Sequence, residues 1–169
     1  MTQHSKTSAH LAVHYRLTHP KSAAPLSKQE MAAWRAFFAT QEVLRGRLER
    51  HLQSDSGLSN ADYTVLVALS EADGGRLRAV ELGQRLGWEK SRLHHQLSRM
   101  CGRGLVRRDS GTGRAMYAAI TDAGRSALEG AVPRHRQHVR RLVVDRLNPE
   151  QIDQLADISA AILAGLRPS

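Results

Sequence analysis

The chain has 169 residues, with 25 lysines and arginines against 16 aspartates and glutamates, a formal net charge of +9. This length suits one domain of ordinary size, or a small domain with helical extensions, and excludes a large multi-domain enzyme. Because 41% of the residues are hydrophobic, the excess positive charge belongs to a chain that can build a core. The composition therefore predicts an acidic partner, with nucleic acid favoured over an anionic membrane surface.

The remaining composition narrows the class of protein. The single cysteine cannot form an internal disulfide, and no apolar run is long enough for a membrane span or a signal peptide. We therefore expect a cytoplasmic protein that has no membrane partner. Aromatic residues make up only 4% of the chain, too few for the stacking surfaces of single-strand binders, so duplex DNA is the predicted nucleic acid.

The N-terminal third begins with an arm and continues with a long helix. Residues 1–25 are polar and rich in histidine, which predicts a flexible or partly helical arm. Ser27 and Glu30 form a capping-box pattern at the start of a helix that runs to residue 55 and stops before Gly57. The apolar stripe of this helix is formed by Met31, Trp34, Phe38, Leu44, Leu48 and Leu52.

Further elements follow in the order helix, helix, helix, hairpin, helix, helix. Start signals at Ser59 and Asn148 resemble the one at Ser27. Helices are predicted from residue 59 to the glycines at 74–75, over 79–86 and over 89–102. Short strands at 105–106 and 116–120 flank a glycine-rich turn. The next helix runs from Thr121 towards Arg146, interrupted or restarted near Pro133, and the last covers 149–166 with an apolar stripe along one face.

The positive charge is concentrated in the middle of the chain. Between residues 76 and 114 there are ten basic and three acidic residues, whereas residues 145–169 contain two basic and four acidic ones. The middle is therefore suited to phosphate, and the striped C-terminal helix to burial against a partner.

Residues 80–100 have the pattern of a helix-turn-helix. Leu82 and Leu86 pack the first helix, while Gly83 permits close approach and Gly87 can adopt the left-handed turn conformation. On the second helix, Leu93, Leu97 and Met100 fall on one side. The opposite side carries small polar, imidazole and guanidinium groups, which a major groove can accept. A solvated basic surface helix is the alternative interpretation.

Several motifs in this region resemble those of the MarR family of winged helix-turn-helix regulators. They are Glu81-Leu82, Leu86-Gly87, Ser91-Arg92, the run from Gly102 to Arg108, an arginine-bearing wing turn, and Ile120 to Gly124. The resemblance implies a mainly α (α+β) fold with a two-stranded wing. It also implies a homodimer, in which residues 27–55 and 121–167 form interlocked dimerisation helices and residues 58–120 form the DNA-binding lobe.

The resemblance also assigns DNA contacts by position. It places the second helix of the helix-turn-helix in the major groove and the wing arginine in the minor groove. By position, Lys90, Ser91, Arg92, His94, His95 and Arg99 fall on that helix, and Arg114 is the wing arginine. The predicted base contacts are Ser91, Arg92, His94, His95 and Arg99. The basic residues around them are predicted to contact phosphates, namely Lys90, Arg76, Arg78, Arg107 and Arg108. One departure from the family is Thr112, which replaces an aspartate that normally holds the wing.

Three groups of residues are candidates for sensing a chemical signal, namely a small aromatic effector, an oxidant or a metal ion. Trp34, Arg35, Phe38 and Tyr63 are candidates for a pocket that binds a small aromatic or phenolic effector, although core and dimer packing alone explain them as well. Cys101 is interpreted as a half-buried packing thiol, with redox sensing as the alternative. His135 and His138, one helical turn apart, are weak metal candidates, and surface imidazoles are the simpler interpretation.

The sequence thus predicts a sequence-specific regulator of transcription, a homodimeric repressor that binds a pseudo-palindromic operator and is released by an effector. A nucleoid-type architectural protein without base selectivity is the alternative, and a winged helix used only for protein contacts is a third class. No enzymatic motif, metal framework or cofactor site is recognisable, so neither catalysis nor a cofactor is predicted.

Overall fold

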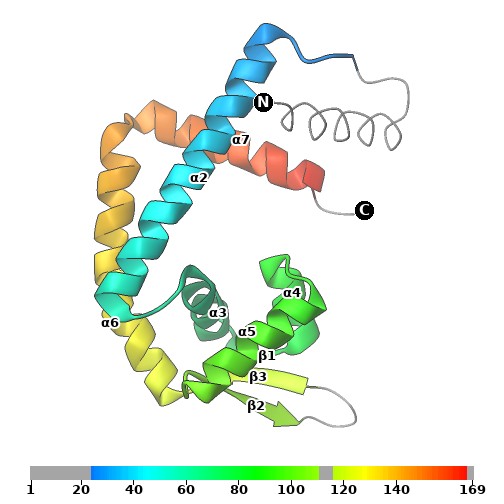
Figure 1. The fold of residues 1–169 in the computed structure, drawn as a ribbon, viewed down its shortest axis with the longest axis vertical. Helices are drawn as coiled ribbons and strands as arrows, with labels where there is room; N and C mark the ends of the chain where they lie inside the picture. Colours follow the sequence, from blue (N-terminus) through cyan, green and yellow to red (C-terminus); the bar gives the residue numbers. More distant parts are fainter. Residues whose placement is uncertain (1–23, 111–115, 167–169) are drawn as a thin grey trace, which may run out of the picture. The chain divides into compact units, whose positions relative to one another are not determined.

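The computed structural model describes residues 24–110 and 116–166 (Figure 1). The chain divides into two compact units. The boundary between the units falls between Gln41 and Glu42, inside the first described helix. The helices are α2 (Lys28–Ser56), α3 (Asn60–Ser70), α4 (Ala79–Leu86), α5 (Lys90–Gly102), α6 (Asp122–Leu142) and α7 (Pro149–Leu166), with 3-10 turns η1 (Asp73–Gly75) and η2 (Val144–Arg146). The strands are β1 (Arg76–Arg78), β2 (Val106–Ser110) and β3 (Met116–Ile120).

Reciprocal side-chain caps close the three predicted helix starts. The backbone N–H of Glu30 donates to Ser27 Oγ at 3.2 Å, and that of Ser27 donates to Glu30 Oε2 at 2.7 Å. Asp62 and Ser59 repeat the arrangement at 3.0 and 2.9 Å, and so do residues 148 and 151 at 2.8 and 3.0 Å. These bonds satisfy N–H groups that have no partner inside the helix, which confirms the predicted starts of α2, α3 and α7.

The sheet has one strand more than the predicted hairpin. Its order is β1-β3-β2, with both pairs antiparallel. The predicted two-stranded wing is confirmed as β2 and β3, and β1 is a third strand that the sequence did not predict. β1 contains only three residues, Arg-Leu-Arg, too few to produce a periodic pattern, and it exists because β3 supplies its hydrogen-bonding partners.

The hydrophobic core lies in the second unit, where helices α3, α4 and α5 pack on the sheet (Figure 1) and where Leu52 of α2 and Leu128 and Ala131 of α6 join the same cluster. Each helix directs its apolar residues inward, as the helical spacing predicts. The largest fully buried side chains are Leu58, Val65, Leu66, Leu69, Leu82 and Met100. This packing fixes α5 with one side against the core and the other side in solvent.

Helix α6 corrects two expectations. It is continuous through Pro133, so the predicted interruption was wrong, and it ends at Leu142 before η2 rather than running on to Arg146. Proline lacks an N–H and therefore removes one hydrogen bond from the ladder, but the rest of a 21-residue helix keeps its geometry.

Helix α7 leaves a nearly complete apolar stripe exposed. Ile152 is the one residue of this helix that is partly buried. The exposed large side chains are Leu155, Ile158, Ile162, Leu163 and Leu166. In the first unit, Trp34, Phe37 and Phe38 of α2 are also exposed, with the rings of Trp34 and Phe38 4.5 Å apart. Patches of this kind mark surfaces that bind a partner. No helix in the described ranges is both long and apolar enough to cross a membrane.

Candidate nucleic-acid interface

Helices α4 and α5 form the predicted helix-turn-helix around two glycines. Gly87 has φ 63°, the left-handed conformation that a tight turn needs. At Gly83, a Cβ atom would lie 3.3 Å from the carbonyl oxygen of Trp88. The N–H of Trp88 also donates to the carbonyl of Gly83 at 2.9 Å. The two helices therefore approach closely because this position has no side chain, as the sequence predicts.

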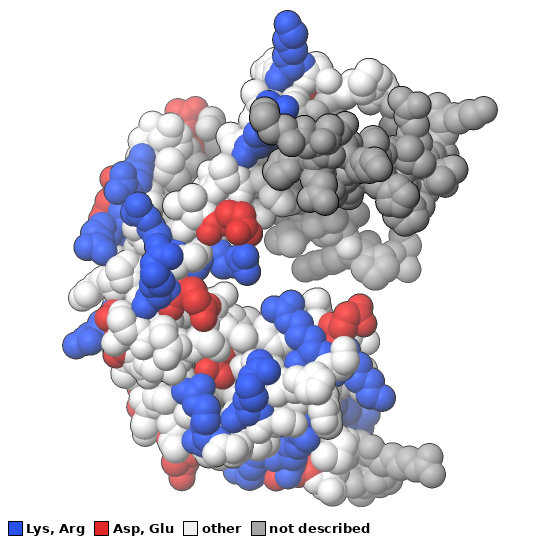
Figure 2. Space-filling view, viewed as in Figure 1, with Lys and Arg blue, Asp and Glu red and all other residues white. Residues whose placement is uncertain are grey.

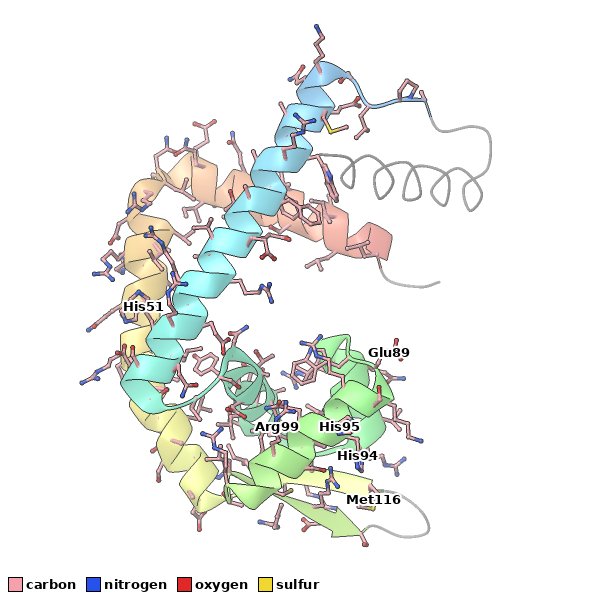
Figure 3. All side chains as sticks on the ribbon, viewed as in Figure 1. His51, Glu89, His94, His95, Arg99 and Met116 are labelled. Atoms are coloured by element: carbon pink, nitrogen blue, oxygen red, sulfur yellow. The ribbon has the colours of Figure 1, made fainter. Side chains whose placement is uncertain are left out.

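Helix α5 has a buried side and an exposed side. Leu93, Leu97 and Met100 are buried, as predicted, together with Gln96, which was not predicted. Figure 3 labels His94, His95 and Arg99 on the ribbon of α5. The predicted base-contact residues all lie on the exposed side, which consists of Ser91, Arg92, His94, His95, Ser98 and Arg99.

The guanidinium of Arg92 has a defined position near the start of α5. Its Cζ lies 4.3 Å from the centroid of the Trp88 ring. A guanidinium stacked on an indole keeps its N–H groups, which lie in its plane, free to donate. Arg92 can therefore donate to the edge of a base while Trp88 restricts its orientation.

Arg107 and Arg108 point to opposite faces of the sheet, because successive side chains of a strand alternate. Arg108 is half-buried and donates to the backbone carbonyl of His94 at 2.8 Å and to Ser98 Oγ at 3.0 Å. Arg107 is exposed and pairs with Asp109 at 3.1 Å. Of these two predicted phosphate contacts, Arg108 therefore connects strand β2 of the wing to α5, and Arg107 remains on the outer face of the sheet.

Arg76 and Arg78 share one aromatic neighbour, Tyr117 on β3. Arg78 Nε donates to the tyrosine hydroxyl at 3.0 Å, and Arg76 Cζ lies 4.2 Å from the ring centroid. The hydrogen bond that Arg78 donates to Tyr117 is the main reason that the pKa of Arg78 is raised, so this guanidinium keeps its charge. Tyr117 therefore gathers two of the predicted phosphate-binding charges.

Basic side chains predominate on the visible face of the lobe formed by α3, α4, α5 and the sheet (Figure 2). Arg85 pairs with Glu71, but Lys90 has no acidic partner among the described residues. A surface with this balance of charge attracts the phosphates of duplex DNA. Arg114 and Thr112 lie outside the described residues.

A buried polar network that the sequence pattern does not predict lies on the inner side of α5. Asp62, only 3% exposed, accepts a hydrogen bond from Gln96 Nε2 at 2.7 Å and another from Arg103 Nη1 at 2.6 Å. Arg103 also donates to the carbonyl of Gly57 at 2.8 Å. Burial by itself raises the pKa of Asp62, but hydrogen bonds from Ser59 and Arg103 together outweigh it and leave the pKa lowered.

A cavity of about 600 Å³ lies between α4, the start of α5 and the sheet. Most of its wall is apolar. Its lining includes Val80, Gly83, Trp88, Leu93, Met116 and Tyr117, together with the predicted DNA contacts Lys90, His94 and Arg108. A molecule in this cavity would therefore touch residues that are also predicted to contact DNA.

The residues predicted for an aromatic effector belong to different units. Trp34, Arg35 and Phe38 are in the first unit, and Tyr63 is in the second. The ring of Tyr63 lies against His135, with centroids 4.5 Å apart. Burial raises the pKa of Tyr63, so the phenol stays neutral. The pocket remains a prediction.

The cysteine and the two candidate metal ligands have other neighbours. Cys101 is half-buried and packs against the core, as predicted. His138 bonds to Asp55 at 2.9 Å, whereas His135 packs on Tyr63, so the two imidazoles have different partners. Within residues 24–110 and 116–166, no three histidines, cysteines or acidic residues are arranged to hold a metal ion.

Comparison with known proteins identifies the fold and the family. A family model described as MarR family matches residues 56–115, while no curated protein matches significantly. Sco3205 of Streptomyces coelicolor, a MarR family transcriptional regulator solved in complex with DNA, is 36% identical, with 87% of this chain and 94% of that chain covered and a TM-score of 0.84. AbsC of the same organism is 35% identical over 86% and 99% of the chains, with a TM-score of 0.81.

A more distant match is the Mycobacterium tuberculosis regulator MosR, also solved with DNA. It is 28% identical over 80% and 98% of the two chains, with a TM-score of 0.62. The family and these neighbours are transcriptional regulators and not enzymes. With its helix-turn-helix, its basic lobe and 36% identity over nearly the whole of a solved relative, the chain belongs to the MarR family of DNA-binding transcriptional regulators.

Proposed function

We propose that this protein is a homodimeric repressor that binds a pseudo-palindromic DNA site with base selectivity. The observation that carries the proposal is the two-sided character of α5, whose inner side is buried and whose outer side presents six exposed polar or basic residues. A helix held rigidly in this way can enter a major groove and present hydrogen-bonding groups to base edges.

The residues divide by chemistry into two groups. Side chains on the outer side of α5 contact bases: Ser91, Arg92, His94, His95 and Arg99. Charges around them contact phosphates, namely Lys90, Arg76, Arg78, Arg107 and Arg108, and Arg114 enters the minor groove, where arginine is favoured by narrow A·T-rich stretches. The stacking of Arg92 on Trp88 and the cluster of Arg76 and Arg78 around Tyr117 support this division.

Dimer formation is supported by the exposed apolar surface. Helix α7 exposes Ile158, Leu163 and Leu166 by 58%, 56% and 72%, and α2 exposes aromatic rings. A second copy of the chain would bury these groups and would place two copies of α5 on a site with twofold symmetry. We therefore assign residues 27–55 and 121–167 to dimerisation and 58–120 to DNA binding.

An aromatic or phenolic effector would release the DNA. Trp34, Arg35, Phe38 and Tyr63 are the residues assigned to it, and the cavity beside Lys90, His94 and Arg108 is a second place where such a molecule would interfere with DNA. An organohalide-sensing regulator of the same fold, 15% identical, has been solved with 2,4-dichlorophenol bound. As a DNA-binding regulator the protein would work at the chromosome, in the cytoplasm.

The test is selection of genomic fragments by the purified protein at moderate salt, followed by binding measurements on the selected site and on random duplex. Selective binding is expected to exceed random binding by about a thousandfold or more. Arg92→Ala should cost about 1–3 kcal/mol on the selected site and relax the base preference. Equal affinity for all duplexes would instead indicate an architectural protein, and no binding would indicate a protein-contact module.

Repression is tested separately. A reporter gene under the selected site should be silenced when the protein is expressed, and the silencing should be lost with Arg92→Ala. Activation of the reporter would overturn the repressor assignment without affecting the assignment of DNA binding.

A further inference from the structure

The buried network on the inner side of α5 contains a chain of two hydrogen bonds that runs from Asp62 through Gln96 to Arg99. We call this chain the relay, and Arg99 is one of the predicted base contacts. Gln96 donates through Nε2 to Asp62 Oδ1 at 2.7 Å, and its Oε1 accepts a hydrogen bond from Arg99 Nη2. Gln96 is 2% exposed, whereas Arg99, which follows it by about one turn on α5 and is labelled in Figure 3, is exposed. The buried amide thus connects the interior of the lobe to its outer surface.

The chemistry of an amide gives this relay a direction. The side chain of Gln96 has one NH2 group and one carbonyl oxygen. An ionised carboxylate only accepts hydrogen bonds, so the NH2 group must face Asp62 and the oxygen is left for Arg99. Arg99 only donates, so the reversed amide would place donor against donor. The charge on Asp62 therefore decides which group Gln96 offers to Arg99.

Asp62 is itself held in place by groups from three segments. Its Oδ2 accepts from the Ser59 N–H at 2.9 Å and from Arg103 Nη1 at 2.6 Å, while Oδ1 accepts from Gln96. A helix cap alone would use only the bond to Ser59. The bonds to Gln96 and Arg103 have no part in capping α3, and they tie this carboxylate to α5 and to the residue that follows it.

We propose that Asp62 and Gln96 are positioning residues for base recognition, which hold the guanidinium of Arg99 in the orientation in which it reads DNA. The proposal rests on the DNA-binding function proposed above. Neither residue reaches DNA in this arrangement, because both are buried. Their effect on selectivity comes from the ordering of a long side chain before it binds.

The experiment measures base selectivity at single positions of the selected site. Arg99→Ala first identifies the base pair at which discrimination is lost. Gln96→Met keeps the length and burial of the side chain but removes both hydrogen bonds. We expect it to reduce discrimination at that same base pair by about 2- to 12-fold, the cost of ordering one long side chain, and to leave the other base pairs unchanged. The double variant should lose no more than Arg99→Ala alone.

Arg103→Gln is the matched control. It removes another partner of the same carboxylate, and a positive charge, but leaves the relay through Gln96 intact. It should lower stability and weaken binding to all sequences alike, with discrimination at the Arg99 base pair preserved. Asp62→Asn is the second test variant in case Gln96→Met does not fold, and it should reproduce the local loss of discrimination.

Three results would overturn the proposal. They are unchanged discrimination in Gln96→Met and Asp62→Asn, a uniform loss at every base pair, and an Arg99→Ala variant that still discriminates everywhere. In each of these cases, the proposed function is still supported if the wild-type protein binds DNA with base selectivity. A wild-type protein without selectivity would overturn both.

Discussion

The imidazole rings of His51 and His138 lie stacked, with centroids 3.7 Å apart and planes inclined by 6°. His51 belongs to α2 and His138 to α6, and Asp55 bonds to the second ring at 2.9 Å. Arg141 also approaches His138 Nδ1 at 3.4 Å. The contact between these two helices therefore contains two imidazoles, one carboxylate and a guanidinium, and its stability must depend on pH.

We predict that the protein loses stability as the pH falls below neutrality. Burial, followed by the charges of His138 and Arg141, lowers the pKa of His51 below 6.5, and burial also lowers that of His135. A histidine with a lowered pKa in the folded state stabilises the fold fully above about 6.5, and this contribution is lost as the pH falls. Urea unfolding between about pH 7 and pH 5 should show a decreasing free energy of unfolding.

The His51→Gln variant should have a flatter pH profile than the wild type, because one titrating group is removed. His95→Gln removes an exposed imidazole from α5 and leaves the stack intact, so it serves as the control and should keep the slope. Asp55 contributes in a separate range: the hydrogen bond from His138 lowers its pKa, so its contribution is lost below about 3.8. A wild-type profile in His51→Gln would contradict the prediction.

Two glycines of α6 should respond oppositely to alanine. A Cβ at Gly124 would lie 2.1 Å from the carbonyl oxygen of Leu105, whereas nothing lies within 4 Å at Gly130. We expect Gly124→Ala to destabilise the fold by about 1–3 kcal/mol, because the steric clash outweighs the stabilisation from the higher helix propensity of alanine. Gly130→Ala should stabilise it by about 0.5–1 kcal/mol. Thermal melts of the two variants provide the measurement, and a shift of the same sign in both would contradict the steric argument.

The sequence alone was sufficient to predict features that depend on residues close together along the chain. The caps at Ser27 and Ser59 are local hydrogen bonds between residues three apart, and the turn at Gly87 needs only one residue with positive φ. The exposed side of α5 follows from the helical period once Leu93 and Leu97 are assigned to the core. Such features carry their own signals in the sequence.

Features that depend on distant partners could not be predicted in this way. In the sequence, Gln96 looks the same as the other polar residues of a basic helix. Its burial is explained by the hydrogen bond to Asp62, which lies 34 positions away along the chain. Strand β1 exists because of β3. The different roles of Arg107 and Arg108 require the register of the sheet, which places Arg108 against α5.

This difference predicts distinct phenotypes for the two arginines. Arg107→Ala should weaken binding to selected and random DNA alike, without loss of stability. The slope of the logarithm of the binding constant against the logarithm of the salt concentration should become shallower by about one. Arg108→Ala should also weaken DNA binding, but it removes two hydrogen bonds to α5 and should destabilise the fold by about 1–2 kcal/mol. Binding at several salt concentrations and denaturant melts separate the two cases, and equal stability of the variants would argue against the tie between wing and α5.

Dimer formation is expected to depend on the apolar stripe of α7. Ile158, 58% exposed, lies at the centre of this stripe, and a glutamate there would have to be buried without a partner in a dimer. Ile158→Glu should therefore convert a dimer into monomers in sedimentation experiments and abolish tight binding to a two-half site while preserving weak binding to one half. Ala160→Glu is the control, because two residues further along α7 the side chain points away from the stripe. A wild-type protein that sediments as a monomer, or a dimer unaffected by Ile158→Glu, would show that the stripe has another partner.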